Sequence, residues 1–348
     1  MRLALYACLV ILLSRPAFAD MPKVAPEGSF WDTSPGFEFP GAKKPKELRR
    51  ALSGIACPSQ SSGPRRCIAA FDEGSEARYA IIEGTRLTPE PERIPLLVGN
   101  GDLDAEGAAT EDGFTYVTGS YSRQRGRCAA SPDRRHVYRL SLQPDGRVRP
   151  DARPADDQGR LWHLLSSSAE LGPFVDKCLG KDGHGINIEG LAARNGQLYF
   201  GFREPARDRK AYILRVDAHA LFEGGDLAPR LFTLEAGKAS GIRDLLAVPE
   251  GILVLVGPDD DSKKDVPWWI GIWDDSDANP NGALRPLAEL RLPPISGDDC
   301  QREIKPEAMT VLDDGPEFRR MLILSDGMCD GGPLAFLIPK RPASGSIQ

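Results

Sequence analysis

The sequence predicts an all-β fold, a single β-propeller with five blades favoured and six possible. A short apolar strand, a turn bearing Gly, Asp or Pro, and a second β-rich strand recur along the chain. This recurrence is typical of a repeated hairpin. More strands follow several copies, so the unit has about four short strands, as in a propeller blade. The strands are apolar on both sides, which fits sheets packed face to face around a ring.

The clearest copy of the hairpin is GINIEGLAARNGQLYFGFR, from Gly185 to Arg203. The copies begin near Leu52, Leu103, Gly185, Ser240 and Ile304, and the copy at Leu52 is the weakest. The long interval between Glu106 and Glu189 leaves room for a sixth blade. A β-sandwich is the alternative fold, but it does not account for the recurring motif.

The N-terminal residues 1–19 are predicted to be a signal peptide. Arg2 precedes the apolar run from Leu3 to Leu13, and Ala17-Phe18-Ala19 supplies small residues for cleavage after Ala19. The run is too short to span a bilayer. We therefore expect a periplasmic or secreted protein without stable membrane insertion.

The mature chain is predicted to contain an N-terminal segment at residues 20–46, part of which closes the ring, a propeller domain at 47–340 and a disordered tail at 341–348. The last copy of the hairpin is followed by one further strand, PLAFLIP, from Pro333 to Pro339. A strand within Phe37 to Ala51 is expected to complete this blade.

Strands after the first hairpin of a unit are predicted from short apolar or aromatic runs. These runs are Ala211 to Val216, Leu231 to Leu234, Pro267 to Trp273, and Ala283 to Leu292. In the second blade, a polar turn from Pro144 to Gly159 and a helix within LWHLLSSSAELGPFVDKC are expected instead. This short helical insertion accounts for most of the long interval.

The chain has seven cysteines, and Cys8 lies in the predicted signal peptide. An even number then remains, which in an exported chain indicates disulfides. We favour the pairs Cys57–Cys67, Cys128–Cys178 and Cys300–Cys329, because each pair lies within or beside one repeat. One or two free buried thiols are the alternative.

Charged residues are interspersed along the chain, with 44 Lys and Arg against 50 Asp and Glu. There is no basic stripe of the kind that nucleic-acid binding requires, so no nucleic-acid partner is expected. GPDDDSKKD, from Gly257 to Asp265, is interpreted as a charged loop, with Ca²⁺ binding as the less favoured alternative.

The stretches GSYSRQRG, INIEGLAARNGQLYFGFREP, GIRDL…LVLVGP and KPEAM…LILSDG resemble a bacterial family catalogued as domain-of-unknown-function family 3616. The resemblance extends in order from about Leu52 to Pro339. It implies a secreted protein with a propeller-like fold, and the family has no established activity. The E-G-L-A element is more distantly similar to phytase-like and esterase-like propellers. Tyr121 stands where the resemblance leads us to expect a histidine, so no role of that histidine carries over to this chain.

Candidate site residues occupy equivalent positions near the start of the first strand of each blade, which lines the channel of a propeller. These residues are Glu106, Glu189, Arg243 and Glu307, with Ser53 in the weakest copy. Carboxylates gathered at one mouth repel unless positive charge balances them. Arg243 is one source of that charge. Ca²⁺ is another, which makes Glu106, Glu189 and Glu307 candidate metal ligands. The alternative is that each Glu binds backbone amides or an arginine of the next blade.

Three further residues follow second strands and are expected at the same mouth, Arg123, Arg203 and Asp326. Arg203 could bind an anionic ligand through two hydrogen bonds, or it could form an ion pair with Glu189 or Glu204. The sequence therefore favours a ligand-binding or interaction module that holds a small anionic ligand or a protein partner.

The alternative function is a Ca²⁺-dependent phosphoesterase-like or esterase-like hydrolase. The sequence has no G-x-S-x-G, H-E-x-x-H or G-x-x-x-x-G-K-[ST] motif. Catalytic residues therefore stay unassigned, and whether the protein is an enzyme is left open.

Overall fold

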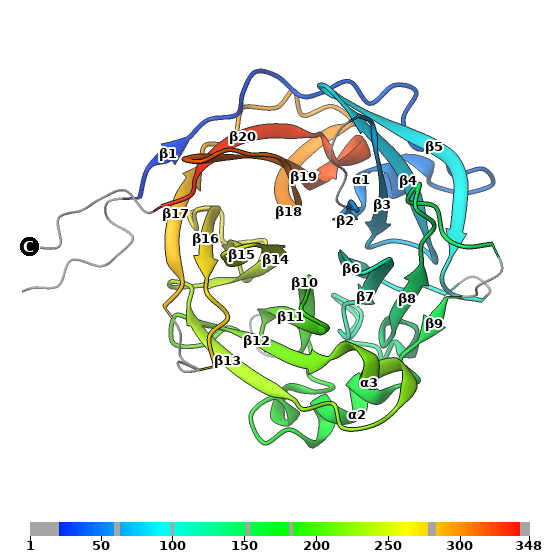
Figure 1. Ribbon diagram of the computed structural model, residues 1–348, viewed down its shortest axis with the longest axis vertical. Coiled ribbons are helices and arrows are strands. Elements are labelled where there is room, and N and C mark those ends of the chain that lie inside the picture. Colours follow the sequence, from blue (N-terminus) through cyan, green and yellow to red (C-terminus); the bar gives the residue numbers. More distant parts are fainter. Residues whose placement is uncertain are drawn as a thin grey trace, which may run out of the picture.

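Five sheets of mainly antiparallel strands surround a central axis (Figure 1), which confirms the predicted five-bladed propeller. The computed structural model describes residues 21–58, 63–98, 101–150, 154–180, 184–277 and 283–341. The predicted signal peptide and residues 342–348 of the predicted tail lie outside the described residues. Among the residues described, no helix combines the length and apolarity needed to cross a bilayer.

The first three blades each have four strands, which follow one another in chain order from the axis outward. The first contains β2 (Leu52–Ala56), β3 (Arg65–Phe71), β4 (Glu76–Glu83) and β5 (Arg86–Pro95). The second contains β6 (Ala105–Glu111), β7 (Phe114–Gly119), β8 (Val137–Ser141) and β9 (Ala155–Asp156). The third contains β10 (Asn187–Arg194), β11 (Gln197–Glu204), β12 (Lys210–Asp217) and β13 (Arg230–Glu235).

The last two blades differ in strand number. The fourth contains β14 (Ser240–Val248), β15 (Gly251–Pro258), β16 (Trp269–Trp273), β17 (Arg285–Leu290) and, outermost, β1 (Lys23–Val24). The fifth contains β18 (Gln301–Asp314), β19 (Phe318–Met328) and β20 (Leu334–Pro339). The five hairpin starts predicted from the repeat therefore coincide with the innermost strands β2, β6, β10, β14 and β18.

The N-terminal segment runs along the outside of the fifth blade, from the fourth blade to the first (Figure 1). β1 pairs in parallel with β17. The backbone N–H groups of Glu27 and Trp31 donate to the carbonyls of Ala335 (2.7 Å) and Pro333 (3.0 Å). The N-terminal segment thus forms hydrogen bonds along the outer edge of the three-stranded fifth sheet, although it is not a regular strand there. These bonds protect the edge.

The predicted strand within Phe37 to Ala51 is wrong, because this region contains the helix α1 (Pro45–Arg50). Proline in the first turn, Glu47 near the N-terminus and two arginines in the last turn favour a helix there. Before α1, the rings of Phe37 and Phe39 pack edge-to-face on Phe71 of the first blade.

The helical insertion of the second blade is present as α2 (Arg160–Ser167) and the 3-10 turn η2 (Gly172–Phe174). The predicted polar turn from Pro144 to Gly159 is partly wrong, because it contains β9, a strand of only two residues. The sequence pattern did not indicate α3 (Ala218–Glu223), whose N-terminus is capped by Asp217 accepting from Ala220 N at 2.7 Å. Two further 3-10 turns are η1 (Pro132–Arg134) and η3 (Cys329–Gly331).

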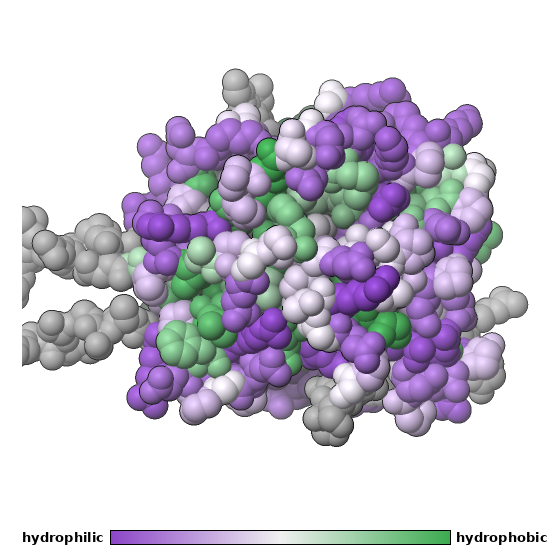
Figure 2. All heavy atoms as spheres, turned by 90° about the horizontal axis from the view of Figure 1, so that it is seen from above, coloured by the Kyte–Doolittle hydropathy of each residue, from purple (hydrophilic) through white to green (hydrophobic). Residues whose placement is uncertain are grey.

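The apolar core is divided into five clusters, one between each pair of neighbouring blades. Both faces of a blade are therefore buried, which explains the apolar runs in the sequence. The rim seen in Figure 2 is mostly hydrophilic, with smaller apolar areas scattered over it. The three predicted disulfides are all present, Cys57–Cys67, Cys128–Cys178 and Cys300–Cys329.

The glycine of the recurring Glu-Gly pair is required where inner strands of neighbouring blades touch. A Cβ on Gly107 would lie 2.7 Å from Cβ of Leu191, and one on Gly190 would lie 2.8 Å from Cγ of Leu245. In the fourth blade Asp244 takes this position. It is buried and accepts a hydrogen bond from the backbone N–H of Met309 in the fifth blade at 2.8 Å. In the second, third and fourth blades, the residue after the motif charge therefore contacts the neighbouring blade.

Replacing Gly107 by alanine is expected to lower the free energy of unfolding by about 1–3 kcal/mol, because the new methyl group overpacks the contact with Leu191. Urea denaturation of the purified protein measures this change. An unchanged midpoint and slope would show that the inner strands are not in close contact.

Candidate functional site

A cavity of about 380 Å³ opens at the end of the channel where the inner strands begin. The predicted residues Glu106, Glu189, Arg203, Glu307 and Asp326 all line it. The sixth predicted residue, Arg243, has no exposed surface and lies behind the lining, where it contacts Glu189 and Glu307. The other lining residues are Asp72, Glu73, Asp104, Ser122, Gln124, Arg125, Arg127, Arg134, Leu179, Asn187, Asp261 and Lys305.

Arg243 bridges two of the three motif glutamates. Its Nε lies 2.8 Å from Oε2 of Glu189 in the third blade, and its Nη2 pairs with Oε1 of Glu307 in the fifth. Ser53 of the first blade donates to Oε2 of Glu307 at 2.8 Å. All four side chains are buried, so each charge depends on its partner in place of water. Four blades are tied together at the axis by this one set of contacts.

Arg203 completes the network from the end of β11. Its Nη1 donates to Oε1 of Glu189 at 2.9 Å, its Nε donates to the carbonyl of Asp259 at 3.0 Å, and its Nη2 pairs with Asp261. Asn187 also donates to Oε1 of Glu189, at 2.9 Å. The guanidinium of Arg203 is thus already matched by acids of the protein, which is the ion-pair alternative that the sequence left open.

Asp261 is a central member of the network that the sequence pattern did not single out. It lies in the charged loop between β15 and β16 and accepts from Nη1 of Arg125 at 2.6 Å, across the cavity from the second blade. Burial alone would raise the pKa of Asp261, but Arg203 and Arg243 hold it far below its usual range. The surrounding arginines therefore favour the ionised form of this carboxylate.

Glu106 differs from the other two motif glutamates. The residue is only 8% exposed and lines the cavity. Within the described part of the chain, no hydrogen bond or ion pair engages its carboxylate. Burial raises its pKa well above the usual range, and the nearby carboxylates of Glu189 and Asp104 raise it further. The site thus contains one buried acid that faces the cavity without a protein partner among the described residues.

Other acids around Glu106 are also perturbed. Burial raises the pKa of Asp104 to about 6, although Arg134 opposes this effect. Burial and the charge of Glu307 raise the pKa of Asp326 to about 6, although its ion pair with Lys305 lowers it. This side of the cavity gathers more negative charge than its neighbours neutralise.

Several of these neighbours stand two residues before a motif position. Asp104 precedes Glu106, Asn187 precedes Glu189, and Lys305 precedes Glu307 at this spacing. The regular alternation of a strand does not explain this spacing, because Asp104 lies before β6 with a positive φ of 53° and register shifts interrupt β10 and β18 at these positions. The recurring spacing itself was a signal in the sequence that could have identified these residues.

A single Ca²⁺ ion requires ligand oxygens about 2.3–2.6 Å from one point, so its ligands lie within about 5 Å of one another. Among the described residues, the one set of three His, Cys, Asp or Glu ligand atoms that close together is His136, Asp156 and Asp157. The predicted metal ligands Glu106, Glu189 and Glu307 do not form such a set. Arg243 supplies the positive charge between Glu189 and Glu307.

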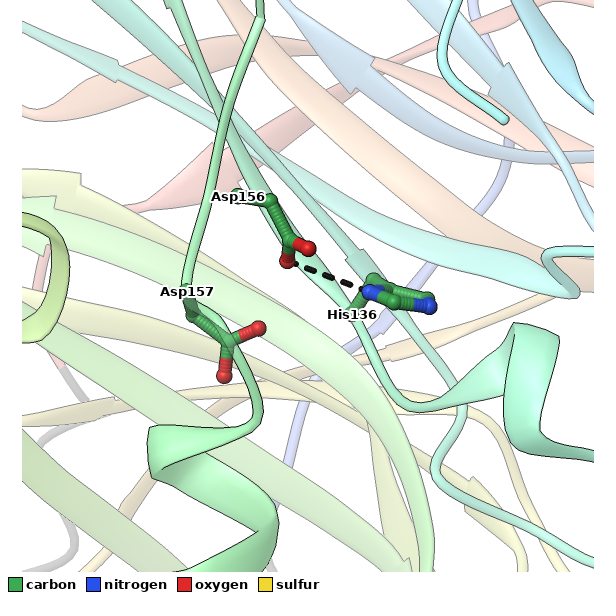
Figure 3. A group of neighbouring side chains, drawn as sticks. All are labelled: His136, Asp156 and Asp157. Atoms are coloured by element: carbon green, nitrogen blue, oxygen red, sulfur yellow. Dashed lines mark hydrogen bonds and ion pairs between the residues drawn. The ribbon is translucent and has the colours of Figure 1, made fainter. Parts of the chain in front are cut away.

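The cluster of His136, Asp156 and Asp157 lies at the outer part of the second blade (Figure 3). Nδ1 of His136 is 3.1 Å from Oδ1 of Asp156. The buried Asp157 accepts from the backbone N–H of Leu161 at 3.1 Å and from the hydroxyl of Tyr121 at 3.2 Å. These contacts attach α2 to its blade, and they give Tyr121 a structural role.

Glu189→Gln is expected to lower the free energy of unfolding by about 3–5 kcal/mol, because Arg203 and Arg243 would keep buried charges without their partner. Chemical denaturation checks this value. Glu83→Gln, the same change on an exposed part of β4, is the matched control. Equal stability of the two variants would contradict the network.

The ion pair between His136 and Asp156 is expected to make stability depend on pH. The hydrogen bond to Asp156 raises the pKa of His136, and the pKa of Asp156 is lowered against burial by its hydrogen bond to His136. The pair therefore stabilises the fold between about pH 4 and 6.5, the unperturbed values. Its effect is lost as the pH rises through the folded-state pKa of His136.

Unfolding of the wild type and of Asp156→Asn, measured from pH 5 to 9, tests this expectation. The stability difference should be largest near the acidic end and should shrink towards pH 9. A difference that does not change with pH would show that His136 is not charged in the folded protein.

Comparison with known proteins identifies a family and supplies no activity. A family profile described as "Protein of unknown function (DUF3616)" matches residues 151–330. No protein among those with curated functions matches the chain.

Solved structures of similar shape include three enzymes. A thermostable family-43 glycoside hydrolase is 13% identical with a TM-score of 0.42, and the match covers 86% of this chain and 95% of that one. A GH43_1 enzyme from Xanthomonas citri is 10% identical with a TM-score of 0.43, over 95% of each chain. The native Bacillus subtilis arabinanase Arb43A is 9% identical with a TM-score of 0.34, over 83% of this chain and 94% of that one. Likeness at this level carries no inference about ligand or reaction.

Proposed function

The chain belongs to the DUF3616 family, and we propose that it is a binding protein that holds a small polar ligand in the mouth cavity. The observation that carries this proposal is the carboxylate of Glu106. A buried polar group without a partner costs free energy, and a ligand that supplies hydrogen-bond donors would remove that cost. In contrast, Glu189 and Glu307 each form ion pairs with buried arginines of the protein.

The size and chemistry of the cavity support a small polar ligand. Its volume of about 380 Å³ falls within the usual range of ligand sites. Sixteen of the seventeen lining residues are polar or charged, and Leu179 is the single apolar one among those described. An apolar ligand would leave these groups desolvated without partners, so hydroxyl, amine or acid groups are the features that we expect in the ligand.

A hydrolase is the alternative function, and one observation favours it. The raised pKa values of Glu106 and Asp72 suit a group that donates a proton. Against it, Arg243 engages two of the three glutamates proposed to hold Ca²⁺. A Ca²⁺-dependent hydrolase would therefore need carboxylates other than Glu106, Glu189 and Glu307 to hold the metal ion.

Thermal unfolding of the purified protein with a panel of small polar compounds tests the proposal. The panel consists of putrescine, glucosamine, glucose, acetate, inorganic phosphate and CaCl₂. At least one organic or anionic member is expected to raise the melting temperature, because a ligand at 100 times its Kd adds about 2.7 kcal/mol. Gln124→Trp, which fills the mouth from a partly exposed lining position, should abolish the shift.

Glu83→Trp places the same side chain at the exposed end of β4 in the first blade and should leave the shift unchanged. A shift that persists in Gln124→Trp, or no shift with any member, would contradict the proposal. Turnover of p-nitrophenyl acetate or p-nitrophenyl phosphate with CaCl₂ that is lost in Glu106→Gln would instead support the hydrolase.

A further inference from the structure

The charges that line the cavity are divided unevenly. Among the described lining residues there are eight carboxylates and five basic side chains. The basic residues nearest the acidic side are already paired. Arg134 contacts Asp102 at 2.6 Å and Asp104 at 2.8 Å, and Lys305 pairs with Asp326.

Two acids on this side are incompletely satisfied among the described residues. Glu106 forms no hydrogen bond or ion pair there, and its interaction with Arg134 is electrostatic only. Oδ1 of Asp72, directly after β3, is buried and accepts no hydrogen bond from the described part of the chain. The two carboxylates are close enough for each to raise the energy of the other's charge. A positive group placed between them would relieve this repulsion and satisfy both.

We infer that the ligand of the mouth cavity is an organic cation whose ammonium group binds beside Glu106, with Asp72 as a further acceptor. This inference rests on the proposed binding function and specifies the chemical class of the ligand. It replaces the anionic ligand expected from the sequence, because Arg203 and Arg243 are already matched by acids of the protein.

An ammonium group fits the geometry better than a metal ion. A metal ion needs several oxygens converging on one point, and no such set among the described residues includes Glu106 or Asp72. An ammonium group has three donors that point in different directions. It can therefore contact one or two separated carboxylates while the rest of the molecule occupies the remaining volume.

Binding of a cation beside Glu106 is expected to change the protonation of the cavity, whereas binding of a neutral ligand is not. Burial raises the pKa of both Glu106 and Asp72, which favours their protonated forms when the cavity is empty. An ammonium group favours the ionised carboxylate. Binding of the cation is therefore expected to shift these acids towards ionisation, and by linkage the affinity should rise with pH as long as the amine stays charged.

Titration calorimetry of the full protein with putrescine and with glucosamine tests the inference. The titrations are run at pH 7 in PIPES and in HEPES, whose ionisation enthalpies differ, so the heat difference gives the number of protons released. At least one of the two amines is expected to bind with net proton release and with higher affinity at pH 8 than at pH 6.

Two variants separate binding chemistry from folding. Glu106→Gln removes the charge at nearly constant shape and should weaken binding of the amine at least about tenfold, the effect of losing one charge-assisted hydrogen bond. Because Glu106 holds no partner among the described residues, this variant should melt no lower than the wild type. Glu83→Gln should bind as the wild type does.

The result distinguishes the inference from the function on which it rests. If glucose, acetate or phosphate binds in the cavity and neither amine does, the ligand class is wrong and the binding function stands. Amine binding without proton release, or with equal affinity in Glu106→Gln, would also overturn the inference. If no member of the panel binds, both fail.

Discussion

The position of Arg243 at the propeller axis is the interaction on which the rest of the site depends. Its fully buried guanidinium lies between Glu189 of the third blade and Glu307 of the fifth. A buried charge depends on ion pairs and hydrogen bonds that take the place of water. The blades must therefore bring these acids to one place, and Glu189 must share its oxygens between Arg243 and Arg203. The same arrangement leaves Glu106 as the motif glutamate that faces the cavity without a protein partner among the described residues.

The closeness of the inner strands and the pairing of their charges support each other. Glycine or another suited residue after each motif position lets neighbouring strands touch, as at Gly107 and Gly190. Because the inner strands are in contact, an arginine of one blade can reach acids of the neighbouring blades. On the acidic side of the cavity, Arg134 pairs with Asp102 and Asp104, and among the residues described no arginine forms an ion pair with Glu106. This asymmetry makes the acidic side a candidate for a positively charged ligand.

The repeat was sufficient to predict the ring, because the hairpins share one apolar pattern, and three of them have a Glu followed by Gly or Ala. It was insufficient where the chain departs from a regular strand. β9 has two residues, too few to show an alternating pattern, and the N-terminal segment protects the fifth blade with isolated backbone hydrogen bonds. The region expected to supply a strand is instead a helix, whose proline and terminal charges were visible in the sequence.

For the site, the sequence located the residues but not their roles. Equivalent positions in the repeat predicted that Glu106, Glu189 and Glu307 would meet at one mouth, and all three line the cavity. Which of them is neutralised depends on side chains from other loops, and Asp261 could be assigned to the network only once the loop between β15 and β16 had a place in space. Metal coordination depends on distances of a few ångströms that spacing along the chain cannot give.

A double-mutant cycle between Arg243 and Glu307 tests the central claim most directly. The free energies of unfolding of Arg243→Met, Glu307→Gln and the double variant are compared with that of the wild type. If the buried pair joins the fourth and fifth blades, the two changes should be non-additive, with a coupling energy of about 2 kcal/mol or more. Additivity within about 0.5 kcal/mol would show that the two residues do not interact, and the account of the axis would be wrong.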